Sequence, residues 1–84
     1  MMATAKIKLN TIDDVKTFVN VASSVDFDID LVSGRYTVDA KSIMGIFSLD
    51  LTKEIEVRAY TSDMGKLTAL RDKCSRFITQ IISY

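Results

Sequence analysis

The sequence predicts an α+β fold in which one sheet is covered on a single face by helices. Four segments alternate between apolar and other residues, with the period of a half-buried strand. Three segments carry apolar residues at helical spacing, and the two kinds of segment follow one another in the order βαββαβα. Because each element has one apolar face, strands and helices bury these faces against each other as two layers.

Length and composition predict a single domain spanning residues 1–84. A chain of 84 residues is near the lower limit for a core that no disulfide or metal supports. Of its residues, 48% are hydrophobic and 26% are charged, which is typical of a soluble globular protein. No linker, repeat or low-complexity segment divides the sequence.

Charge and cysteine content exclude several classes of function. Eleven basic residues balance eleven acidic ones, so no basic field is available to attract nucleic acid or an anionic membrane. No apolar run is long enough to span a membrane, and the first residues lack the apolar core of a signal peptide. The lone Cys74 cannot form an internal disulfide and fits a reducing compartment. We therefore expect a cytoplasmic protein that binds neither nucleic acid nor membranes directly.

The first strand and helix are expected near the N-terminus, after a frayed start at residues 1–4. The apolar residues of this strand alternate with lysines: Ala5, Ile7 and Leu9. Asn10 or Thr11 then caps a helix that ends near residues 23–24. One apolar stripe runs along this helix: Ile12, Val15, Phe18, Val19 and Ala22. Asp13 and Asp14 lie in its first turn, where negative charge suits the helix dipole.

A β-hairpin is expected next. Its first strand alternates apolar residues with aspartates: Phe27, Ile29 and Leu31. Ser33-Gly34-Arg35 is a tight-turn signal, and residues 36–40 form the second strand. The carboxylates of Asp26, Asp28 and Asp30 are expected to lie on a solvated face. A calcium loop or a two-carboxylate active site would need glycine and turn chemistry that these positions lack.

The remaining elements are a short helix from Ser42 to about Leu49, a fourth strand over residues 54–60 and a last helix. Ser62 or Asp63 caps this last helix. Its apolar stripe is expected to continue to the C-terminus: Met64, Leu67, Leu70, Cys74, Phe77, Ile78 and Ile81. Cys74 is expected to be a small core residue on that stripe.

The strongest functional signal is the stretch at residues 41–49, which reads KSIMGIFSL. Ser42 is a favoured N-cap, because its oxygen can accept from a free amide of the first helical turn. The apolar residues that follow crowd into barely more than one turn, so they cannot all face one core. We therefore expect some of them to be exposed as a docking surface beside a hydroxyl that can be modified. The alternative is an ordinary capped core helix.

This stretch resembles the regulatory-serine segment of the HPr family, the small phosphocarrier proteins of the bacterial sugar phosphotransferase system. The resemblance extends through residues 21–23, 26–31 and 37–38 to Leu49, roughly the middle half of the chain. It implies an open-faced β-sandwich, with a four-stranded antiparallel sheet covered on one face by three helices. In this family an ATP-dependent kinase phosphorylates the serine, so the resemblance implies that Ser42 is a phosphorylation site.

The family's carrier histidine has no counterpart, because this chain contains no histidine. In HPr proteins it opens the first helix within a Gly-x-His-x-Arg-Pro string. Counting back from Ser42 without gaps places Thr11 at its position, with Asp13 and Asp14 where the arginine and proline would be. A threonine phosphate is too stable for a carrier, and two carboxylates in this turn oppose phosphate binding. Thr11 is therefore expected to be a capping residue, with Asp14 as its partner in a capping box.

The leading hypothesis is a non-enzymatic regulatory protein that resembles the catabolite-repression branch of the family and is controlled at Ser42. The resemblance implies two partners, the HPr kinase/phosphorylase and a LacI-type transcription regulator. It also implies that the starts of the first two helices share one surface. The expected partner-binding residues are Ile12, Lys41, Ile43, Met44 and Phe47.

Two other hypotheses remain open. The chain could be a degenerate adaptor that binds a protein through the apolar patch without phosphorylation. An active phosphocarrier is the least favoured reading, because the histidine is missing. Neither a metal nor a cofactor is expected, and the sequence leaves the oligomeric state open.

Overall fold

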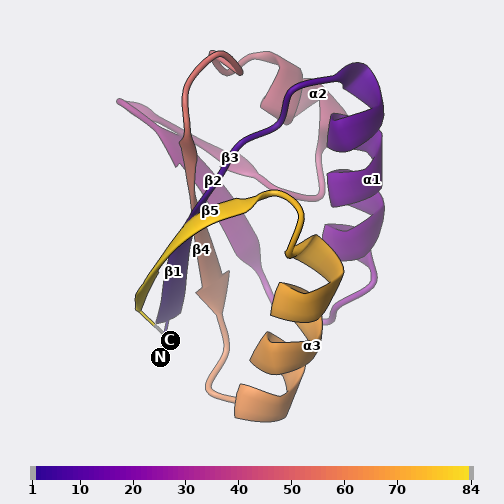
Figure 1. Cartoon of the computed structure of the whole chain (residues 1–84), viewed down its shortest axis with the longest axis vertical. Coiled ribbons are helices and arrows are strands. Elements are labelled where there is room, and N and C mark those ends of the chain that lie inside the picture. Colours follow the sequence, from indigo (N-terminus) through magenta and orange to yellow (C-terminus); the bar gives the residue numbers. More distant parts are fainter. Residues whose placement is uncertain (1, 84) are drawn as a thin grey trace.

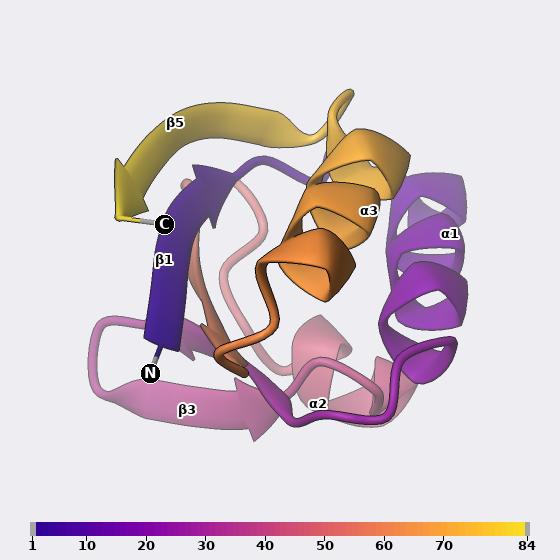
Figure 2. The same cartoon turned by 90° about the horizontal axis from the view of Figure 1, so that it is seen from below.

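Five strands and three helices build residues 2–83, the part of the chain that this computed structural model describes (Figure 1). In chain order they are β1 (Met2–Ile7), α1 (Ile12–Ser23), β2 (Ile29–Ser33), β3 (Tyr36–Asp39), α2 (Ile43–Phe47), β4 (Ile55–Tyr60), α3 (Met64–Cys74) and β5 (Ile78–Ser83). The strands form one antiparallel sheet in the order β3-β2-β4-β1-β5. The helices lie on one side of it (Figure 2). The predicted α+β class and open-faced arrangement are confirmed.

The strand count differs from the prediction of four, because the last helix is shorter than expected. α3 ends at Cys74, and β5 pairs antiparallel with β1. Ile78 pairs with Ile7, and Ile81 pairs with Ala5. Between these two pairs β5 therefore contains one more residue than β1, which is a register shift of the β-bulge kind. That irregularity places Ile78 and Ile81, which line the same cavity, three residues apart, which is also the spacing of a helix. The branched side chains of β5 favour the strand.

β1 begins earlier than expected. Residues 2–4 were predicted to be frayed, but Met2 pairs with Tyr60 and Thr4 with Arg58 of β4. The backbone of these residues is therefore held in the sheet, and the side chain of Thr4 is buried. Residue 1 lies outside the described part of the chain.

The hydrophobic core lies between the sheet and the helices. Its largest fully buried side chains come from every layer of the fold: Ile7, Leu9, Ile29, Leu31, Ile46, Ile55 and Val15. Phe18 of α1 meets Phe77 edge to face, with ring centroids 6.2 Å apart. Cys74 is a core residue as predicted, and burial raises the pKa of its thiol to about 11. The thiol is therefore protonated and unreactive at neutral pH.

The predicted hairpin is confirmed as β2 and β3. Gly34 turns the chain between them with φ of 59°, a conformation that glycine adopts without steric cost. Ala40 follows β3 and is fully buried, and its N–H donates to the Ile29 carbonyl at 2.9 Å. This contact returns the chain to the core just before Ser42 and so fixes where α2 begins.

Candidate functional site

Ser42 is the N-cap of α2. Its Oγ accepts from the Gly45 N–H at 3.3 Å, and its carbonyl accepts from the Ile46 N–H at 3.1 Å. The residue is exposed. A Cβ at Gly45 would lie 3.4 Å from the Ser42 oxygen and 3.2 Å from the Val38 Cβ, so glycine leaves this corner open. The hydroxyl that the sequence singled out is therefore both structural and accessible.

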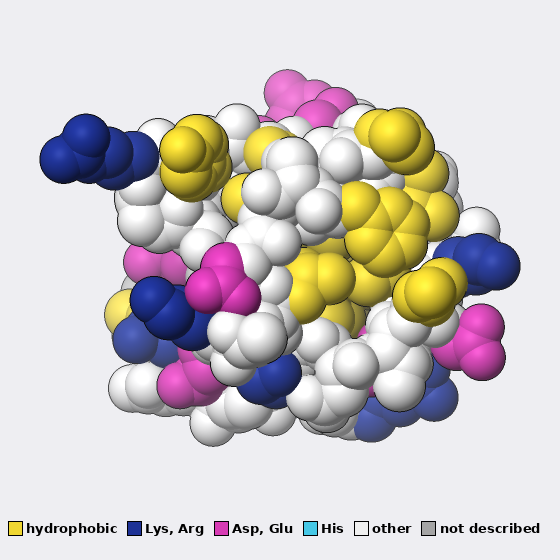
Figure 3. Space-filling model, turned by 90° about the horizontal axis from the view of Figure 1, so that it is seen from above, with side chains coloured by type: hydrophobic (Ala, Val, Ile, Leu, Met, Phe, Trp, Pro, Cys, Tyr) yellow, Lys and Arg dark blue, Asp and Glu magenta, His cyan; other side chains and the backbone are white. Residues whose placement is uncertain are grey.

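Three large apolar side chains are exposed around the start of α1 and along α2, and we call them the apolar patch: Ile12, Met44 and Phe47. Their exposed fractions are 63%, 75% and 42%. α1 and α2 contact each other, and Figure 3 shows hydrophobic side chains gathered over this end of the molecule. The exposure predicted for these three residues is confirmed. Apolar side chains exposed together mark a docking surface when they form one contiguous patch.

The other apolar residues of α2 hold the helix on the core. Ile46 is fully buried, and Ile43 is half-buried and packs against the core cluster. A five-residue helix has too few hydrogen bonds to be stable alone, so this anchorage keeps Ser42 and the patch in place. Ile43 thus contributes less free surface than Met44.

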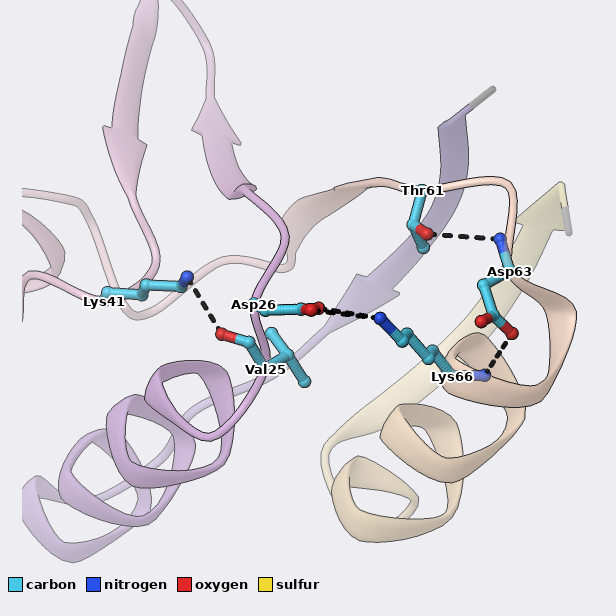
Figure 4. Close-up of polar contacts among 6 residues, drawn as sticks. All are labelled: Val25, Asp26, Lys41, Thr61, Asp63 and Lys66. Carbon is cyan, nitrogen blue, oxygen red and sulfur yellow. Dashed lines mark hydrogen bonds and ion pairs between the residues drawn. The ribbon is translucent and has the colours of Figure 1, made fainter.

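The Lys41 side chain contacts the loop that follows α1. Its Nζ donates to the Val25 carbonyl at 3.2 Å, in a partly buried position (Figure 4). Its backbone N–H donates to Asp39 Oδ1 at 2.8 Å. In this arrangement the Lys41 side chain links the residue before the α2 N-cap to the loop after α1 by a hydrogen bond. Its predicted role at a partner surface would require the ammonium to leave that carbonyl.

Thr11 caps α1 as predicted. Its Oγ1 accepts from the Asp14 N–H at 3.0 Å. In return Asp14 Oδ2 accepts from the N–H groups of Thr11 at 3.2 Å and Asn10 at 2.9 Å. This is a complete capping box with aspartate in place of the usual glutamate. The protein's own carboxylate thus occupies the Asn10 and Thr11 amides at this helix start and places a negative charge where a phosphate would have to bind.

Arg76 also lies at this site, and no local sequence pattern predicts it there. It lies in the turn between α3 and β5, and its Nη2 is 3.7 Å from Asp14 Oδ1. Its guanidinium also lies over the Phe77 ring, 4.6 Å from the centroid. The Asn10 hydrogen bond, followed by those of Thr11 and the charge of Arg76, holds the pKa of Asp14 below its ordinary value. Asp14 is therefore ionised at neutral pH and competes with any incoming anion.

The two helix starts differ in their electrostatics. The first turn of α1 holds Asp13 and Asp14, whereas the first turn of α2 holds no acidic residue. A phosphate on Ser42 would meet favourable backbone dipoles, while one on Thr11 would meet two carboxylates. Of the two helix starts, only that of α2 lacks acidic residues in its first turn that would repel a phosphate.

A second polar cluster joins the α1–β2 loop to α3. Lys66 Nζ lies 3.0 Å from both carboxylate oxygens of Asp26 (Figure 4). Asp63 caps α3 by accepting from the Lys66 N–H at 3.1 Å. The hydrogen bond from Lys66 holds the pKa of Asp26 below its ordinary value. Because both side chains are exposed, this ion pair contributes little to stability.

Within residues 2–83, the structure brings together no group of three or more His, Cys, Asp or Glu side chains suited to a metal ion. Among the same residues, no helix is long and apolar enough to cross a bilayer. Asp28 is exposed and Asp30 half-exposed, in keeping with the solvated face expected for them.

Known phosphocarrier proteins resemble this chain in sequence and in structure. A family model described as "PTS HPr component phosphorylation site" matches residues 14–73. HPr-C-His from Thermoanaerobacter tengcongensis is 30% identical with a TM-score of 0.66, over 86% of this chain and 88% of that one. HPr from Bacillus anthracis is 28% identical with a TM-score of 0.63, over 86% and 95% of the two chains. Among curated proteins no match was found. The region matched by the family model includes Ser42 and begins after Thr11.

Proposed function

Because the chain belongs to the HPr family, we propose that it is a regulatory protein of the sugar phosphotransferase system that does not carry phosphate on histidine. The observation that carries this proposal is the contrast between the two helix starts. Ser42 and Thr11 are both exposed N-caps, but the helix start at Ser42 holds no acidic residue, whereas the one at Thr11 holds Asp13 and Asp14. The sequence has no histidine that could replace the carrier. The chain then acts by binding partners and catalyses no reaction.

Phosphorylation of Ser42 is the proposed control. A phosphate group adds roughly 1.5–2 negative charges at pH 7. The charge would stand at the start of α2, whose first turn holds no acidic residue, so the helix is retained. It would also stand beside the exposed side chain of Met44. The patch would change from purely apolar to apolar with an anionic rim, and partners that offer a basic group would then be favoured.

We propose that the chain belongs to the family's catabolite-repression branch, and with it we propose two partners. The HPr kinase/phosphorylase would modify Ser42 and remove the phosphate. A LacI-type transcription regulator would bind the phosphorylated form through the apolar patch. We also propose a cytoplasmic location, where both of these partners would act.

Incubation with a cognate HPr kinase and ATP is expected to add one phosphoryl group to the chain. Intact-mass and peptide mass spectrometry should locate it on Ser42. Ser42→Ala should abolish the modification, because Thr11 stands in a turn with two carboxylates. Ser48→Ala is the matched control, because Ser48 is the exposed C-cap of the same helix and should not affect the reaction. If Ser42 carries no phosphoryl group under conditions that phosphorylate a known HPr, the proposal is wrong.

The alternative is an HPr-fold adaptor that uses the apolar patch without phosphorylation. Its support is the exposure of Ile12, Met44 and Phe47, which does not depend on any modification. Ser42 would then be an N-cap and nothing more. The two functions share the surface and differ only in whether the Ser42 hydroxyl matters.

Titration against the LacI-type regulator of the same organism separates these two functions. Under the regulatory proposal, phosphorylated chain should bind at least about tenfold more tightly than unmodified chain, because a charge-assisted contact of ~1.4 kcal/mol corresponds to that factor. Met44→Asp should weaken the binding of both forms by removing an apolar contact. Binding that requires Met44 but is equal for wild type, phosphorylated chain and Ser42→Ala would favour the adaptor.

A further inference from the structure

β5 is an edge of the sheet. In the order β3-β2-β4-β1-β5 its neighbour among the described residues is β1 alone, so a row of its backbone N–H and C=O groups faces outward. Figure 2 shows β5 as the outermost strand, curving away from α3. An open row of this kind binds another extended strand by backbone hydrogen bonds.

The sequence of β5 leaves this edge unprotected. Its six residues, ITQIIS, include no charged residue, proline or glycine. Natural edge strands are usually guarded by charges, proline or very short length. From Thr79 to Ser83 every residue is exposed, and the side chains of Ile81 and Ile82 are 43% and 48% exposed. This strand combines open backbone groups with exposed, branched apolar side chains, which are the two features that favour pairing.

The opposite edge of the sheet is guarded. β3 has only four residues and ends in Asp39, whose carboxylate accepts from the backbone of Lys41. Arg35 precedes the strand and is exposed. A pairing of β5 with β3 of another molecule would place a charged strand edge against an apolar one. Such a head-to-tail contact would also leave a free β5 edge and a free β3 edge in every assembly, so further copies would add to form an open filament. The molecule therefore offers one favourable edge, and its best complement is the same edge of a second copy.

We infer that two copies of this chain associate by antiparallel pairing of β5 with β5, which joins their sheets across a two-fold axis. The pairing is self-complementary, because the six residues of β5 themselves carry no charge; the nearby carboxylate is that of Glu54, which accepts from the Thr79 hydroxyl near the start of the strand. The formal net charge of the chain is zero, so the copies do not repel each other as whole bodies either. A partner strand would also cover Ile81, which lines an apolar cavity of about 60 Å³ between α3 and the sheet.

This association is independent of the proposed function. α2 packs against β3, at the opposite edge of the sheet from β5. Six paired residues per copy make an interface smaller than the ~1,200–2,000 Å² of stable complexes, so the dimer is expected to be reversible. Its dissociation constant should lie in the micromolar to millimolar range, on the order of 10⁻⁵–10⁻³ M.

Sedimentation equilibrium of the full chain, from micromolar to millimolar concentration, tests the inference. Wild type is expected to shift reversibly from monomer to dimer, with no larger species. Ile82→Lys should weaken dimerisation at least tenfold, because it places two like charges in one short ladder. Tyr36→Lys, at an exposed position on the β3 edge, is the matched control and should leave the dimer unchanged.

A charge-reversal experiment shows whether a variant fails to dimerise because β5 no longer pairs with its copy or because the chain no longer folds. Ile82→Lys and Ile82→Glu should each be monomeric, and an equimolar mixture of the two should recover a heterodimer. Circular dichroism should show that both variants keep the wild-type fold. A wild type that stays monomeric at millimolar concentration, or a dimer that Ile82→Lys leaves intact and Tyr36→Lys disrupts, would overturn the inference. Phosphorylation of Ser42 could still succeed in either case.

Discussion

Leu67→Ala is expected to lower the free energy of unfolding by about 2–5 kcal/mol, since a buried leucine in a packed core costs that much when truncated. Leu67 is 3% exposed and lines the apolar cavity between α3 and the sheet. The side-chain deletion would enlarge a space that the surroundings already fail to fill. For a small domain with a total stability of roughly 5–15 kcal/mol, this loss is a large fraction.

Urea denaturation followed by circular dichroism measures this loss as a lower midpoint with little change in slope. Met64→Ala is the control on the same helix, because Met64 is 45% exposed and its truncation should change stability by less than about 0.5 kcal/mol. Equal stability of Leu67→Ala and wild type would mean that α3 does not depend on this contact with the sheet.

Ile46→Ala should produce a loss of similar size, about 2–5 kcal/mol, from the centre of α2. Ile46 is fully buried, whereas Met44, two residues away on the same helix, is 75% exposed. Met44→Ala should therefore leave the melting midpoint nearly unchanged and weaken partner binding instead. Thermal unfolding of both variants, beside titration with the partner, measures the two effects.

Phe47 decides how far the apolar patch extends. At 42% exposure, truncation to alanine should affect binding more than stability. If Phe47→Ala unfolds the protein, Phe47 belongs to the core and the free surface shrinks to Ile12 and Met44. If Ile46→Ala and Met44→Ala lose equal stability, the division of α2 into a core side and a docking side is wrong.

The sequence by itself determined the features that depend on neighbouring residues. The Thr11–Asp14 capping box, the Ser42 cap and the turn at Gly34 each involve groups no more than a few positions apart. Their chemistry is set before the chain folds, so a local pattern predicts them. The short helix α2 also contains more apolar residues than can face the core at once. This pattern predicted that some of them are exposed, and the exposure of Met44 and Phe47 confirms it.

Only the tertiary structure decided β5 and the contacts between distant segments. Ile78 and Ile81 have the spacing of a helical stripe, and pairing with β1 and an irregular register made them a strand. Arg76 reaches Asp14 because the turn after α3 passes the start of α1. The local pattern does not distinguish these outcomes, because a short apolar run can bury the same face as a helix or as a strand. The choice depends on which partner lies beside it in the folded chain.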